Sequence, residues 1–237
     1  MTAPAAPGGR VGPAGARRLA ELASPDVVSG VILAVPIGAT EQHGPHLPLG
    51  TDTEIACALA ERLAAARPDV VVAPALPYGS SGEHAMFPGT LSIGQDAFER
   101  VVTELVRSAD AFAGTVLVCA HGGNAEALAR AVATLSGEGR RVLSWSPRVT
   151  AGDAHAGRTE TSLMLAIAPT IVRSERAAPG DTRPLAEVGA TLRSSGVAAV
   201  SPNGVLGDPT GASAAEGTAL LDALAADLVA AVEGWAG

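Results

Sequence analysis

Acidic and histidine side chains that could bind a metal ion lie close together early in the chain. Glu41-Gln42-His43 places a carboxylate and an imidazole two residues apart. In an extended segment, residues i and i+2 point to the same side, so both side chains can face one ion or two adjacent ions. The following loop, rich in glycine and proline, ends at Asp52. Asp52 alone could be a first-turn carboxylate favoured by the helix dipole, but beside Glu41 and His43 we interpret it as a metal ligand.

A second polar cluster, His121-Gly122-Gly123-Asn124, lies between a predicted strand and a predicted helix. We predict that His121 brings a second imidazole to the same site and that Asn124 occupies the helix N-cap. The glycines allow close backbone approach, and a helix N-terminus offers amide donors for developing negative charge. Serine esterases also use a His-Gly-Gly loop, but they need a Gly-x-Ser-x-Gly elbow, and the nearest segment, 79–82, lacks that pattern.

A third cluster, residues 153–162, places His155 in a loop and Glu160 in the first turn of a predicted helix. Glu160 could be a capping-box or helix-dipole residue, or it could be a metal ligand, and we predict the ligand role. We predict His155 as the catalytic proton shuttle. His84, in a long loop, could contact the substrate or make a structural hydrogen bond, and we assign it, with Asn124, to substrate binding.

The ligand set predicts the type of metal centre. It holds the carboxylates of Glu41, Asp52 and Glu160 and the imidazoles of His43 and His121, with no thiolate. Oxygen and nitrogen ligands of this kind suit Zn, Mn or Fe. Five such ligands exceed what one catalytic zinc usually takes. We therefore expect two divalent ions per subunit, about 3.5–4 Å apart, bridged by one carboxylate.

The elements that must position these residues alternate between strands and helices. Buried-type strands are predicted at 31–37, 70–73, 115–120 and 141–146, and helices at 51–66, 95–112, 124–136, 159–168 and about 213–234. This alternation predicts an α/β fold with a parallel sheet covered on both faces. Ligands of such sheets bind at the carboxyl ends of the strands, and all five histidines follow predicted strands.

Composition excludes several classes of function. The net charge of −8 argues against nucleic acid or an anionic membrane as the partner. The sequence contains no lysine, which excludes Schiff-base and P-loop chemistry. Two cysteines in apolar contexts favour a reducing, cytoplasmic location. Residues 1–15 lack signal-peptide features and are expected to form a flexible N-terminus, and residues 16–237 a single catalytic domain.

The motifs resemble those of the creatininase family. The matching segments are 37–48 with 50–53, 83–92, 121–124 and 155–162, in the family's order. The resemblance implies a three-layer α/β/α sandwich with a mainly parallel sheet, a dinuclear metal site and a homo-oligomer, often a hexamer. It makes Glu41, His43, Asp52 and His121 ligands, with Asp52 bridging. Creatinine-cleaving members have a glutamate at the position of Gly123, so we propose that Glu160 supplies the remaining ligand and that creatinine is not the substrate.

Further segments resemble the branch of this family that matures mycofactocin. They are 153–162 and 195–201, leading into 204–210. That branch removes a modified C-terminal Val-Tyr dipeptide from a decarboxylated precursor, so the resemblance implies a metal-dependent hydrolase with a modified ribosomal peptide as substrate. A creatinine or formamide amidohydrolase is the alternative enzyme. A non-catalytic, metal-binding oligomeric protein is the alternative of another class.

Overall fold

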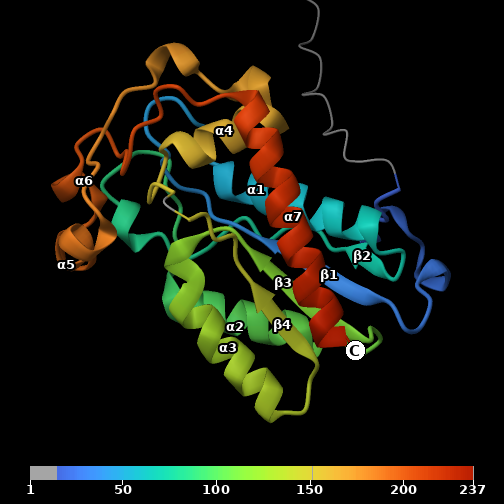
Figure 1. Cartoon of the computed structure of the whole chain (residues 1–237). Coiled ribbons are helices and arrows are strands. Elements are labelled where there is room, and N and C mark those ends of the chain that lie inside the picture. Colours follow the sequence, from blue (N-terminus) through green and yellow to red (C-terminus); the bar gives the residue numbers. More distant parts are fainter. Residues whose placement is uncertain (1–14, 151, 237) are drawn as a thin grey trace, which may run out of the picture.

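The computed structural model describes residues 15–150 and 152–236, which fold around a four-stranded parallel sheet (Figure 1). The strands follow the spatial order β2-β1-β3-β4. Their bounds are β1 Ile32–Ile37, β2 Val70–Val72, β3 Gly114–Cys119 and β4 Val142–Trp145. The three pairings between these strands are parallel, as the sequence predicts.

The two central strands are almost entirely apolar because helices cover both of their faces. Every residue of β1 and of β3 is buried, as expected for parallel strands between two helical layers. The register pairs Ile37 with Cys119, so the two strands end at the same edge of the sheet. The loops that carry Glu41 and His121 therefore leave the sheet at this edge.

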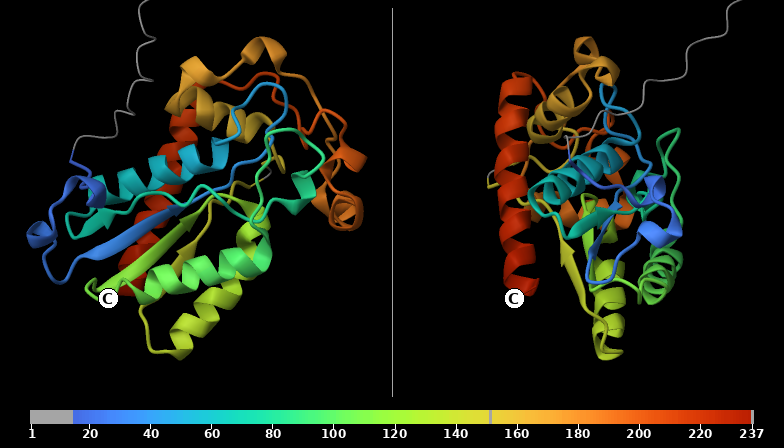
Figure 2. Two further views of the ribbon diagram at one scale, coloured as in Figure 1. Left: turned by 180° about the vertical axis from the view of Figure 1, so that it is seen from behind. Right: turned by 90° about the vertical axis from the view of Figure 1, so that its right-hand side faces the viewer.

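Helices form a layer on each face of the sheet. Figure 2 shows α7 on one side and α2 with α3 on the other. The bounds of the helices on the two faces are α1 Thr51–Ala66, α2 Gly94–Arg107, α3 Ala125–Gly137, α4 Arg158–Ile167 and α7 Ala214–Ala236. Alternate residues of β1 divide the core, since Ile32 and Ala34 pack with α1, α4 and α7, whereas Leu33 and Val35 pack with α2 and α3. The predicted three-layer α/β/α sandwich is confirmed.

Several elements differ from the sequence prediction. α2 ends at Arg107 rather than at residue 112, because the backbone after it turns through bonds between residues three apart. Val101, an apolar residue of α2, is 39% exposed. Two helices were not predicted, α5 Leu185–Ser195 and α6 Val197–Val200. Short 3-10 helices also occur: η1 Leu19–Glu21, η2 Ser24–Asp26, η3 Gly82–His84, η4 Gly122–Asn124, η5 Pro169–Ile171 and η6 Ser174–Arg176.

α5 and α6 help to position the site, because both pack against η3, the element that carries His84. The predicted flexible N-terminus falls, apart from Gly15, on residues outside the described range. Within the described part of the chain, no helix combines the length and apolar character needed to cross a membrane.

Candidate metal centre

The polar residues predicted from the sequence meet at the carboxyl edge of the sheet. Glu41 and His43 lie in the loop after β1, Asp52 is the second residue of α1, and His121 lies two residues after the end of β3. These four side chains are almost completely buried. Glu160, in the first turn of α4, reaches the same place with a side chain that is 21% exposed.

Asp52 stands at the middle of this group. Its Oδ1 lies 3.0 Å from His43 Nε2, and its Oδ2 lies 3.2 Å from His121 Nδ1. Glu41 Oε2 lies 3.3 Å from His121 Nε2. Glu160 Oε2 lies 3.9 Å from His43 Nε2. The two oxygens of Asp52 therefore face two different imidazoles, a geometry suited to a carboxylate that bridges two ions.

Backbone carbonyls determine which nitrogen of each ring carries the proton. His43 Nδ1 lies 3.1 Å from the Glu41 carbonyl oxygen and donates to it, which leaves a lone pair on Nε2. His121 Nε2 donates to the Ser80 carbonyl oxygen at 2.8 Å, which leaves a lone pair on Nδ1. Both lone pairs then point at Asp52 oxygens. Such contacts between acceptors are repulsive unless a cation lies between them or the rings gain a second proton.

Two buried carboxylate oxygens also suit the binding of a cation. Glu41 Oε2 and Asp52 Oδ2 are buried without a hydrogen-bond partner in the described structure. Glu41, Asp52 and His121 offer ligand atoms within 4.8 Å of one another, and so do His43, His155 and Glu160. A buried carboxylate oxygen without a donor is costly, and a divalent ion would satisfy it. The donors are all oxygen or imidazole nitrogen, so the residues fit divalent ions of the Zn, Mn and Fe type.

The pKa values of the buried histidines also show that the carboxylates of the site favour a positive charge beside them. Burial opposes the charged form of His43, but Asp52, Glu160 and Glu41 outweigh it and raise its pKa to about 10. Burial likewise opposes charge on His121, and Asp52 and Glu41 raise its pKa well above the usual value. Burial would raise the pKa of Asp52, but the two histidines hold it low. Protons on the two rings thus neutralise the carboxylates, and a bound metal ion would take their place.

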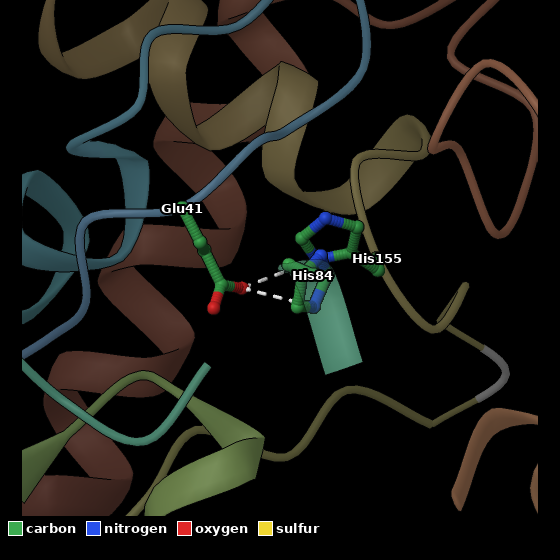
Figure 3. A group of neighbouring side chains, drawn as sticks. All are labelled: Glu41, His84 and His155. Carbon is green, nitrogen blue, oxygen red and sulfur yellow. Dashed lines mark ion pairs between the residues drawn. The ribbon is translucent and has the colours of Figure 1, made fainter. Parts of the chain in front are cut away.

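Two further imidazoles approach the other oxygen of Glu41, as Figure 3 shows. His84 Nε2 lies 3.4 Å and His155 Nδ1 lies 3.8 Å from Glu41 Oε1. Burial lowers the pKa of His84 to about 4 and that of His155 well below its usual value. His155 Nε2 donates to the Gln42 carbonyl oxygen at 2.8 Å, so Nδ1 carries the lone pair that faces the site. His155 is therefore a neutral ring with an acceptor directed at Glu41.

Glu160 combines the two roles considered for it in the sequence. Its Oε2 accepts a hydrogen bond from the Ala156 backbone N–H at 2.5 Å, which is a capping-type contact at the start of α4. The same oxygen is the one that approaches His43. Burial raises the pKa of Glu160 to about 7, with His43 opposing this shift and Asp52 adding to it. The capping bond directs the carboxylate into the site, so the two roles are compatible.

Asn124 holds the N-cap position of α3, as predicted, but its side chain makes no capping bond. Its Oδ1 accepts from the Ser80 N–H at 2.8 Å, and its Nδ2 donates to the Gly38 carbonyl oxygen at 3.2 Å. The amide is completely buried and ties the loops after β1 and β2 to the edge of the sheet. Its role in substrate binding stays a prediction, which these contacts do not favour.

A cavity of about 240 Å³ opens beside the centre, and its lining includes Asp52, His121, His155 and Glu160. Sequence reasoning missed one buried residue here, Gln42, whose side chain is next to both His84 and His155. The signal was present, because a polar residue between two candidate ligands in an extended segment must face away from them.

Comparison with known proteins identifies relatives over most of the chain. The family profile described as "Creatininase: Creatinine amidohydrolase" matches residues 20–232. The "Mycofactocin precursor peptide peptidase" of Mycolicibacterium smegmatis is 53% identical over 193 residues and 78% of each chain. That of Mycobacterium ulcerans is 48% identical over 213 residues, which cover 86% of this chain and 85% of the relative.

Solved creatininase structures share the fold. The structure described as "Crystal structure of creatinine amidohydrolase (creatininase)" has a TM-score of 0.70 and 28% identity, and the match covers 85% of this chain and 89% of that one. "Creatininase Mn" has a TM-score of 0.76 and 25% identity, with 92% and 98% covered. The site, the profile match and these relatives together show that this chain is a hydrolase belonging to the creatininase family.

Proposed function

We propose that this chain is a metal-dependent peptidase that removes the modified C-terminal Val-Tyr dipeptide from the mycofactocin precursor peptide. The observation that carries the hydrolytic chemistry is Asp52, whose two oxygens face Nε2 of His43 and Nδ1 of His121, two buried imidazoles. The substrate is supported by relatives bearing the name of this activity, at 48% identity over 86% of this chain. Glycine at position 123, where creatinine-cleaving members have glutamate, argues against creatinine.

Two overlapping sets of ligands would hold a pair of divalent ions. Glu41, Asp52 and His121 would hold one ion, and His43, Asp52 and Glu160 the other, with Asp52 shared. The distances around Asp52 and the partnerless oxygens of Glu41 and Asp52 support this division. Bound there, such ions lower the pKa of a water molecule and polarise a carbonyl group.

His155 would move the proton in this reaction. Its Nδ1 carries a lone pair because Nε2 is engaged with the Gln42 carbonyl oxygen. When the water oxygen bonds to the scissile carbonyl carbon, Nδ1 can accept the proton that the water loses. The C–N bond then breaks, and the same nitrogen gives the proton to the departing amine. The low pKa of the buried ring favours this second transfer.

Mass spectrometry with the decarboxylated, modified precursor peptide tests this function. Protein loaded with Zn, Fe or Mn should release the terminal dipeptide, and protein treated with a chelator should not. A precursor that ends in Val-Ala serves as the matched control for recognition of the modified residue. If protein shown to hold two ions cleaves no precursor with any metal, the peptidase proposal is wrong, and creatinine and formamides become the substrates to test.

The active form is proposed to be a homo-oligomer, with a hexamer favoured. Exposed apolar side chains on the loops beside the site support this, since Tyr78, Met86 and Leu91 are 45%, 76% and 54% exposed. Light scattering coupled to size exclusion would measure the molar mass. A monomer at micromolar concentration would contradict the proposal, and Met86→Glu should shift an oligomer towards smaller species.

A further inference from the structure

The side chain of Gln42 lies buried between two imidazoles of the site. Its Nε2 is 2.8 Å from His84 Nδ1, 3.1 Å from His155 Nε2 and 3.0 Å from the Gly204 carbonyl oxygen. Its Oε1 accepts a hydrogen bond from the Gly44 N–H at 2.9 Å. Because the chain extends through Glu41 and His43, Gln42 points away from the predicted ligands and towards the rings behind them.

Two backbone groups determine the orientation of this amide. The Gly44 N–H can only donate, so the atom that it contacts must be the oxygen. The Gly204 carbonyl can only accept, so the atom beside it must be the nitrogen. The Gln42 amide nitrogen has no lone pair, and its second hydrogen therefore points to an acceptor. That acceptor is His84 Nδ1, which must therefore be unprotonated, so the ring carries its proton on Nε2.

His155 is oriented by the backbone of the same residue. Its Nε2 donates to the Gln42 carbonyl oxygen at 2.8 Å, so the 3.1 Å approach to the Gln42 amide brings two donors together and is not a hydrogen bond. The amide hydrogens of Gln42 thus go to His84 and Gly204. Gln42 therefore determines the tautomers of both rings: its side-chain amide determines that of His84, and its backbone carbonyl group determines that of His155.

The two rings therefore present a hydrogen-bond donor and a hydrogen-bond acceptor to the same atom, Glu41 Oε1. His84 offers an Nε2–H at 3.4 Å from Glu41 Oε1, and His155 offers a lone pair on Nδ1 at 3.8 Å from the same oxygen (Figure 3). A hydrolytic site needs both functions, a donor for the oxygen that gains negative charge and an acceptor for the proton of the attacking water.

We propose that Gln42 is a positioning residue that holds His84 as a hydrogen-bond donor and His155 as a proton acceptor at the reaction centre. The assignment of tautomers stands on the contacts alone, whereas its catalytic consequence rests on the proposed hydrolysis. His84 would donate to the substrate carbonyl oxygen as this oxygen becomes negative. His155 would take the proton from water.

The glycine at position 204 leaves the space that the Gln42 amide occupies. Gly204 has φ +80°, and a Cβ there would lie 1.9 Å from Gln42 Oε1. A side chain at 204 would push the amide out of its position between the rings. Gly44, whose N–H holds the same oxygen, also has positive φ, at +64°. The glycine in the 204–210 motif is therefore required by its contact with Gln42.

Nitrogen-15 NMR of histidine-labelled, zinc-loaded protein tests the proposal, because protonated and unprotonated ring nitrogens have well-separated shifts. Wild-type His84 should carry its proton on Nε2 and none on Nδ1, and His155 should carry its proton on Nε2. In Gln42→Glu the new carboxylate can only accept, so the single ring proton of His84 should move from Nε2 to Nδ1, which removes the Nε2–H donor, while His155 Nε2 keeps its own proton. Gln95→Glu is the control, because the Gln95 amide donates to the Gly123 carbonyl oxygen and contacts neither ring. It should leave the protonated nitrogens of His84 and His155 unchanged.

Peptide cleavage provides the second readout. Gln42→Glu should lower kcat by about a hundredfold, the usual effect of losing one oxyanion donor, with a much smaller change in KM. A proton on Nδ1 of His84 in the wild-type protein, or an unaltered kcat in Gln42→Glu, would overturn the positioning role. If the wild-type protein cleaves no precursor, the proposed function fails, while the NMR result still decides the role of Gln42. The wild-type spectrum needs no variant, so a failure of Gln42→Glu to fold leaves the test intact.

Discussion

Replacing Asp52 with asparagine is the sharpest perturbation of the proposed centre. The variant keeps the shape of the side chain but removes the negative charge that faces His43 at 3.0 Å and His121 at 3.2 Å. An ion held by these rings would lie within 4 Å of that charge. One unit charge at about 4 Å, with an effective dielectric constant of about 20, corresponds to about 4 kcal/mol. A divalent ion would lose at least this much, so we expect metal affinity to fall about a thousandfold or more.

Metal content after dialysis, measured by elemental mass spectrometry, and competition with a fluorescent chelator would give the stoichiometry and the affinity. Asp69→Asn is the matched control. Asp69 pairs with Arg67 just before β2, at the amino end of that strand, whereas the site lies at the carboxyl edge of the sheet. Its metal content should equal that of the wild type. If Asp52→Asn kept two ions with affinity within tenfold of the wild type, a bridging role for Asp52 would be excluded.

Three further predictions concern protons, catalysis and packing. First, metal loading at pH 7 should release protons, because carboxylates raise the pKa of His43 to about 10 and an ion must displace that proton; affinity should therefore fall as pH decreases. Calorimetry in buffers of different ionisation enthalpy measures the release. Second, His155→Ala should keep its metal but lose about a hundredfold or more in kcat in the peptide assay. Third, Gly204→Ala should destabilise the fold by more than Gly139→Ala in urea unfolding. Both glycines have φ near +80°, but only at 204 would the Cβ meet Gln42.

Each of these predictions has a clear contrary result. Heats independent of the buffer would mean that His43 is already neutral before metal binds. Normal turnover in His155→Ala would leave the proton transfer to another group. Equal losses of stability at positions 204 and 139 would mean that only the backbone conformation matters and that the contact with Gln42 costs nothing.

The sequence alone determined the layers of the fold and the edge where the site lies. Continuous apolar runs such as that of β1 predict buried parallel strands, and the bounds predicted for α1 agree with the structure. Polar residues that follow such strands must gather at the carboxyl edge, since parallel strands all end there. This reasoning depends only on local pattern and on a general property of parallel sheets, and it brought Glu41, His43, Asp52 and His121 to one place.

Only the tertiary structure determined the hydrogen-bond partners and packing contacts between segments that are distant in the sequence. The protons on His84 and His155 depend on Gln42, which is 42 and 113 residues away in the chain. The amide of Asn124 serves backbone groups of distant loops rather than its own helix. The short helices α5 and α6 form where they pack against η3, a contact that sequence periodicity does not reveal. Propensity and spacing describe each segment by itself, whereas hydrogen-bond direction and the space around a side chain arise only when segments meet.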